Sequence, residues 1–156
     1  MNLKKLKRLL ENDNHDYREK LQLLMSDPIF SPRFELSLKE QRNLAFVRLQ
    51  KLFRSGLVDL HDFETDPRRI FALHDICGLV DGSLATKLTV QLNLFGGTVL
   101  KFGNRERWQK LREQANRLEA VGCFALTELG YGNNAVAMET EAVYDHKLKG
   151  FVIHTP

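Results

Sequence analysis

Over the first 120 or so residues, apolar side chains recur at the three-to-four-residue spacing of a helix face. Residues 3–10 place their leucines on one side of such a helix and basic residues around the rest. Later helices are expected to begin at residues that can satisfy free N–H groups, namely Asp16, Ser37 with Glu40 in a capping box, Asp66 before Pro67, Ser83 and Asn104. The pattern therefore predicts about five or six helices.

Two of these helices have features that predict how they pack. The helix from Ser37 has a broad apolar stripe, which consists of Leu44, Phe46, Val47, Leu49, Leu52 and Phe53. The helix from Ser83 is interrupted by Gly96 and Gly97, each of which costs roughly 1 kcal/mol in a helix interior. Such a cost indicates the close approach of another helix, a kink or a ligand. From the residues alone we favour close packing.

Beyond this helical region the hydrophobic period changes from that of a helix to that of a strand. The apolar run Val121–Leu126 is bounded by turn residues and predicts a buried strand. Residues 141–144 and 151–154 predict a β-hairpin with a loop of moderate length. We therefore expect a mostly α chain, with a helical domain over residues 1–120 and the start of a β-domain over residues 121–156.

Such a β-domain is incomplete. A hairpin and one strand leave strand edges and one apolar face uncovered, so they do not form a self-sufficient sheet. The sequence is therefore expected to be a fragment or a truncated product.

The composition is that of an ordinary globular protein, with 43% apolar and 28% charged residues among 156. The net charge of +3 is too small to indicate a nucleic-acid partner. No apolar run approaches the ~20 residues that a membrane span requires. Cys77 and Cys123 lie in apolar surroundings, which predicts buried, reduced thiols. The histidines lack metal-ligand spacing, and His74 is expected at a packing boundary.

The predicted strand leads into a loop, residues 127–134, that combines a hydroxyl, a carboxylate, glycines and amides. Small ligands often bind at such strand ends, because glycine lets backbone N–H groups come close to a ligand. A lone Gly-x-Gly is nevertheless a weak motif. On spacing alone, a plain strand-to-loop turn is the favoured interpretation.

A family resemblance favours a ligand-binding loop over a plain turn. The stretch Cys-Phe-Ala-Leu-Thr-Glu-Leu-Gly-Tyr-Gly-Asn-Asn, with the later Met-Glu-Thr-Glu-Ala-Val-Tyr-Asp and Phe-Val-Ile-His-Thr-Pro, resembles the flavin-contact segment of the acyl-CoA oxidases. These enzymes belong to the acyl-CoA dehydrogenase superfamily. The resemblance is close over Cys123–Pro156 and looser upstream, through Gln91–Gly97 and on to Phe102 and Gly103. It implies an N-terminal α-domain that leads into a β-domain.

The resemblance also implies a reaction. In the family, FAD accepts a hydride from Cβ of a fatty acyl-CoA while a glutamate takes the Cα proton, and the product is the trans-2-enoyl-CoA. Oxidases then reduce O2 to H2O2. Because the family's glutamate base lies far downstream, no catalytic residue is expected in this chain. Glu128, beside the motif threonine, is expected to make structural hydrogen bonds instead.

The implied contacts are specific. The resemblance gives four cofactor-binding residues and one substrate-binding residue, which are Ala125, Leu126, Thr127 and Gly132 for FAD and Asn133 for the acyl-CoA. Among them the hydroxyl of Thr127 is implied to hydrogen-bond the pyrimidine edge of the flavin. Dehydrogenases typically have proline where this chain has Leu129, which favours the oxidase branch.

Two alternatives stay open. One is an acyl-CoA dehydrogenase that passes electrons to an electron-transferring flavoprotein, and the other is a truncated, non-catalytic helical protein that pairs with a full-length oxidase. The isolated chain is expected to be inactive and to bind flavin weakly or not at all, while the full-length form is expected to be a homo-oligomer.

The expected location is intracellular, in the peroxisome of a eukaryote or otherwise in the cytoplasm. The basic residues 3–10 could also be a mitochondrial transit peptide, but they contain no serine and more lysine than arginine, which favours a surface helix.

Overall fold

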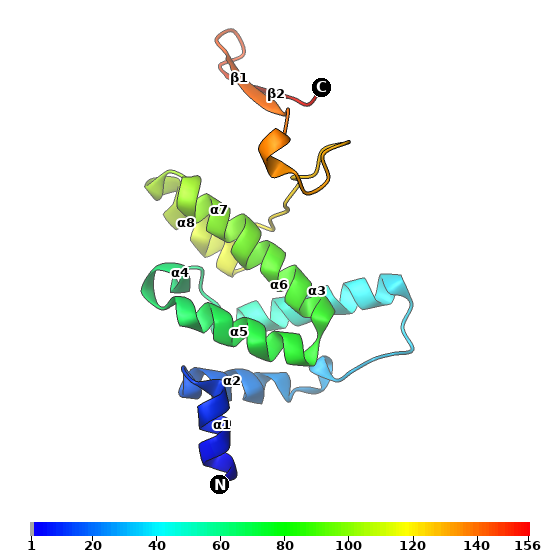
Figure 1. Cartoon of the computed structure of the whole chain (residues 1–156), viewed down its shortest axis with the longest axis vertical. Helices are drawn as coiled ribbons and strands as arrows, with labels where there is room; N and C mark the ends of the chain where they lie inside the picture. Colours follow the sequence, from blue (N-terminus) through cyan, green and yellow to red (C-terminus); the bar gives the residue numbers. More distant parts are fainter. Residues whose placement is uncertain (1) are drawn as a thin grey trace. The chain divides into compact units, whose positions relative to one another are not determined.

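The computed structural model describes residues 2–156 and is mostly α-helical, with one short antiparallel hairpin near the C-terminus (Figure 1). The predicted fold class is thereby confirmed. The chain divides into two compact units, Met1–Cys123 and Phe124–Pro156. The elements of the first are α1 (Leu3–Glu11), α2 (His15–Met25), the 3-10 helix η1 (Pro28–Phe30), α3 (Leu38–Arg54), α4 (Asp62–Thr65), α5 (Pro67–Val80), α6 (Gly82–Thr89), the π-helix η2 (Val90–Gly96), α7 (Gly97–Phe102) and α8 (Arg105–Asn116).

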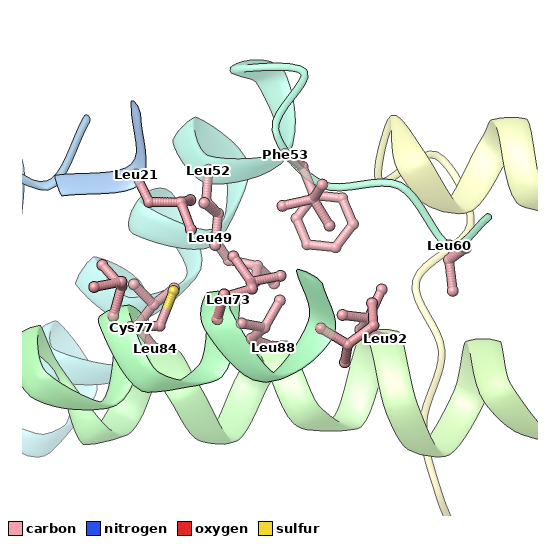
Figure 2. Packing of buried hydrophobic residues seen from close by; sticks show 14 of the residues in the cluster. Leu21, Leu49, Leu52, Phe53, Leu60, Leu73, Cys77, Leu84, Leu88 and Leu92 are labelled. Atoms are coloured by element: carbon pink, nitrogen blue, oxygen red, sulfur yellow. The ribbon is translucent and has the colours of Figure 1, made fainter. Parts of the chain in front are cut away.

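The core of the helical unit lies between α2, α3, α5 and α6. Helix α3 packs on α6, and α5 contacts both α2 and α6. Figure 2 shows the side chains that meet there, which include Leu21, Leu49, Leu52, Phe53, Leu60, Leu73, Cys77, Leu84, Leu88 and Leu92. Each fully buried leucine contributes about 1.5–3 kcal/mol by leaving water, so this cluster is the main stabilising feature of the unit. Helix α1 has no buried residue and is the surface helix that its pattern predicts.

The helix ends confirm some predicted caps and correct others. The capping box at the start of α3 is present, with the Ser37 N–H donating to the Glu40 carboxylate at 2.8 Å. The predictions that Asp16 and Ser83 are N-caps are wrong. Asn14 precedes α2, and Asp81 caps α6 by accepting the N–H of Ser83 at 2.8 Å. An aspartate oxygen reaches the N–H two residues ahead of it, so the carboxylate rather than the serine hydroxyl closes this turn.

The predicted apolar stripe of α3 is buried at three positions, partly buried at Leu44 and Phe46, and wrong at Val47. Leu49, Leu52 and Phe53 are buried, whereas Val47 is 45% exposed. The next residue, Arg48, lies in the interior instead of Val47 and is only 5% exposed. The guanidinium of Arg48 can be buried because its nitrogens donate to the carbonyls of Ile29 and Ser31 and to the carboxylate of Asp81.

The paired glycines do not break their helix. Helix α6 continues through the π-helix η2 into α7, with Gly96 at the end of the π-helix. A Cβ atom on Gly96 would lie 2.0 Å from Cδ2 of Leu60, which follows α3. The predicted close packing is therefore confirmed, although the neighbour is a loop leucine rather than another helix.

The second unit contains the 3-10 helix η3 (Ala135–Ala137) and the strands β1 (Glu141–Asp145) and β2 (Gly150–His154). The strands pair antiparallel, with Val143 opposite Val152, and this confirms the predicted hairpin. The carboxylate of Asp145 accepts the N–H groups of Lys147 and Leu148 and so shapes the connecting turn.

The strand predicted over Val121–Leu126 is wrong. These residues form no regular secondary structure, and in residues 2–156 the only sheet is the two-stranded hairpin. An apolar run becomes a strand only where another strand offers backbone hydrogen bonds, and none does so here. The prediction that Cys123 is buried is also wrong, because this thiol is exposed. Cys77 is buried as predicted.

Candidate functional site

The loop from Phe124 to Asn134 turns twice. The N–H of Tyr131 donates to the carbonyl of Glu128 at 3.2 Å, and the N–H of Asn134 donates to the carbonyl of Tyr131 at 2.7 Å. Gly130 has a φ of +89° and Gly132 a φ of +50°, values that residues with a Cβ rarely adopt. Each glycine is a central residue of one turn, so the Gly-x-Gly spacing is what allows the loop to reverse direction twice.

The predicted contact residues lie on or before these turns and are open to solvent. All five are exposed, namely Ala125, Leu126, Thr127, Gly132 and Asn133. Within the described chain the hydroxyl of Thr127 has no hydrogen-bond partner. Thr127 follows residues without regular secondary structure, which differs from the rigid β-edge that the sequence predicts. A cavity of about 540 Å³ in the same unit is lined by other residues, which are Met138, Glu139, Glu141, His154 and Pro156.

Glu128 joins this loop to the chain just before β1. Its carboxylate accepts the N–H of Glu139 at 2.7 Å and the N–H of Thr140 at 2.9 Å, and it also accepts the hydroxyl of Thr140. These donors, the Thr140 hydroxyl foremost, hold the pKa of the Glu128 carboxyl below its ordinary value. The predicted structural role of Glu128 is confirmed. We call the Glu128–Glu139–Thr140 cluster the carboxylate latch.

The latch extends toward the second strand. The hydroxyls of Thr140 and Thr155 lie 2.9 Å apart, and Thr155 follows the last residue of β2. A hydrogen bond with Glu139 raises the pKa of the Tyr131 hydroxyl above its ordinary value. The sequence did not indicate these partners, because they lie eight to fifteen residues apart and outside any regular pairing pattern. The turns, the latch and the hairpin thus form one hydrogen-bonded unit.

Across residues 2–156, His, Cys, Asp and Glu side chains form no group of three or more that could hold a metal ion. None of the helices over these same residues is long and apolar enough to cross a membrane. His74 is half-buried, and its Nδ1 lies 2.8 Å from the carbonyl of Ile70, which confirms the predicted boundary position.

Known proteins resemble the chain in sequence. No model of a protein family matches it. It is 38% identical over 135 residues to peroxisomal acyl-coenzyme A oxidase 3 of Homo sapiens, a match that covers 85% of this chain and 19% of that protein. It is 32% identical over 169 residues to a putative peroxisomal acyl-coenzyme A oxidase 3.2 of Arabidopsis thaliana, which covers 99% of this chain and 25% of the relative.

Solved structures resemble it in fold. Acyl-CoA oxidase 1 of Yarrowia lipolytica is 28% identical with a TM-score of 0.78, and the match covers 96% of this chain and 22% of that one. Acyl-CoA oxidase 3 of the same organism is 26% identical with a TM-score of 0.77, and the match covers 99% of this chain and 22% of that one. The predicted resemblance is confirmed, and it extends well upstream of Cys123. The chain spans about a fifth to a quarter of the length of these relatives.

Proposed function

We propose that this chain, which is similar in sequence and fold to one part of the acyl-CoA oxidases, is the N-terminal portion of an FAD-dependent acyl-CoA oxidase. The whole protein would convert a fatty acyl-CoA to the trans-2-enoyl-CoA and reduce O2 to H2O2. The relatives from Homo sapiens and Arabidopsis thaliana are named as peroxisomal, and we propose the peroxisome for this protein as well.

The observation that carries the proposal is an exposed threonine hydroxyl without a partner in the described chain, at the position where the resemblance puts the flavin contact. Thr127 is exposed, and the neighbouring residues Ala125 and Leu126 are exposed and not part of a helix or a sheet. Free backbone and hydroxyl groups of this kind suit the pyrimidine edge of a flavin, which both donates and accepts hydrogen bonds. These residues therefore fit the cofactor that the family uses.

FAD, when bound, supplies the acceptor for the hydride that leaves the acyl group. The task of this chain would be to bind and orient that cofactor. The hydroxyl of Thr127 would hydrogen-bond the flavin, and Gly132 would let the loop backbone come close to it. Asn133, next in the turn, would hydrogen-bond the acyl-CoA. The carboxylate latch would hold the loop that carries these groups in one conformation.

A chimera tests the proposal. In it, the matched part of this chain, 85% of its length, replaces the matching segment of the Homo sapiens oxidase. We expect flavin binding and acyl-CoA-dependent H2O2 formation. Reduction of an electron-transferring flavoprotein without H2O2 would instead favour the dehydrogenase alternative. A chimera that folds but never holds FAD would refute both.

Variants of the chimera test the contact residue. Thr127→Ala should weaken FAD binding by up to about tenfold, the equivalent of one hydrogen bond, while Thr127→Ser keeps the hydroxyl and should bind nearly normally. Thr98→Ala is the matched control, because Thr98 is also exposed but lies on α7. Equal FAD affinity in all four proteins would remove Thr127 from the cofactor site.

A further inference from the structure

The buried amide of Gln91 joins the π-helix to the segment that leaves the helical unit. Gln91 is 2% exposed and lies in η2. Its Nε2 donates to the carbonyl of Ala120 at 2.9 Å, and its Oε1 accepts the N–H of Gly122 at 2.9 Å. Both polar ends of the side chain are therefore satisfied by one short stretch of backbone about thirty residues away, immediately before Cys123.

This pairing is costly to lose. The backbone after α8 is irregular and has no strand or helix partner of its own at Gly122. A buried donor or acceptor without a partner costs about 1–3 kcal/mol, so removal of the Gln91 amide penalises the present path of the chain. An apolar side chain of the same size would fill the space and leave both backbone groups unpaired.

A second contact from the same helix fixes the same residue. Phe95 also belongs to η2, and a Cβ atom on Gly122 would lie 1.9 Å from its Cγ. Only glycine leaves room for the ring, so the backbone of Gly122 is held between the Gln91 amide and the Phe95 ring. The π-helical stretch carries both side chains. Segments of π-helix are rare in proteins, and those that do occur are often found at functional sites.

We propose that Gln91 is a positioning residue for the flavin-contact segment. Its two hydrogen bonds clamp the backbone of Ala120 and Gly122 at the end of the helical unit. This inference rests on the proposed function, because it assigns Gln91 to the support of the loop that would hold FAD. Gln91 acts through the backbone of residues 120–122 and touches neither cofactor nor substrate. With the clamp in place, the backbone of residues 120–122 is held on the helical unit.

Amide hydrogen exchange of the 156-residue chain tests the clamp directly. Gln91→Met keeps the size of the side chain and removes both hydrogen bonds, and we expect exchange at Gly122 to become about tenfold faster. Gln91→Glu keeps an acceptor for the Gly122 N–H and should restore part of the protection. Asn93→Ala is the matched control, since Asn93 lies in the same π-helix and its Oδ1 has no hydrogen-bond partner. It should leave Gly122 unchanged.

The FAD affinity of the chimera tests whether the clamp matters for the cofactor. Gln91→Met should raise the Kd for FAD several-fold, Gln91→Glu less, and Asn93→Ala not at all. A merely structural role would lower thermal stability in Gln91→Met without moving the Kd of the folded protein, and this result would overturn the proposal. Unchanged exchange at Gly122 in Gln91→Met would overturn it as well.

The two hypotheses fail in different ways. If the unmutated chimera holds no FAD, the proposed function fails and the positioning role with it, while the exchange data still decide whether the clamp exists. If Gln91→Met does not fold, Gly122→Ala replaces it. That variant keeps the Gln91 amide and displaces the backbone from the Phe95 ring, so it should also raise the Kd for FAD. Normal FAD affinity in Gly122→Ala would then overturn the proposal.

Discussion

Replacement of Arg48 by methionine is expected to cause one of the largest losses of stability available to a single substitution in this chain. Arg48 lies on the inner face of α3, and its side chain is 7% exposed. Its Nε donates to the carbonyl of Ile29 at 2.7 Å, its Nη2 to the carbonyl of Ser31 at 2.5 Å, and its Nη1 to Asp81 at 2.6 Å. The guanidinium thus ties η1, α3 and the N-cap of α6 together.

The magnitude follows from what the substitution leaves behind. The side chain of Asp81 is only 12% exposed, so its carboxylate would be nearly buried without a counter-charge. Removal of one partner of a buried ion pair costs about 3–5 kcal/mol. Methionine preserves most of the apolar volume of the arginine side chain, so packing losses add little. We expect a loss of about 4 kcal/mol in the free energy of unfolding.

Urea unfolding followed by circular dichroism measures this loss, which should appear as a lower midpoint with an unchanged slope. Arg42→Met is the matched control, because Arg42 is exposed on the same helix, and it should stay within about 0.5 kcal/mol of the parent. In an Asp81→Asn background, Arg48→Met should cost less, since no uncompensated charge remains. A loss below about 1 kcal/mol for Arg48→Met alone would refute the reasoning.

Three further predictions concern backbone space, thiols and pH. Gly96→Ala should cost about 1–3 kcal/mol in urea unfolding because its Cβ would lie 2.0 Å from a leucine atom, whereas Gly78→Ala, with open space around it, should be neutral or stabilising; equal effects would contradict the packing argument. A thiol reagent should modify Cys123 rapidly in the native chain and Cys77 only after denaturation, because burial raises the pKa of Cys77 to about 12; two fast thiols would contradict this. The carboxylate latch should weaken in acid, because the pKa of Glu128 is lower in the folded chain than in the unfolded chain. The contribution of Glu128 to stability is complete above its unfolded pKa of about 4.3 and is lost as the pH falls through its folded pKa. Faster amide exchange at residues 139 and 140 should report this loss.

Most of the helices and the hairpin can be predicted from the sequence alone, because they depend on local signals. The capping box of Ser37, the Asp66–Pro67 start of α5 and the Asn104 cap of α8 act over two or three residues, and each is present. The alternation over residues 141–154 likewise predicts the hairpin, which is present. The motif after Cys123 also sufficed for the family resemblance.

The burial of particular polar residues and the path of the apolar run after α8 depend on contacts that form only when the chain folds. Arg48 and Gln91 read as ordinary helix residues in the sequence, and they are buried because distant backbone groups accept and donate their hydrogen bonds. The run Val121–Leu126 has the composition of a strand but lacks a partner strand in the described residues. The physical reason is common to both cases: a helix cap is satisfied by neighbours in sequence, whereas a buried polar group or a strand is satisfied by partners that only folding brings near.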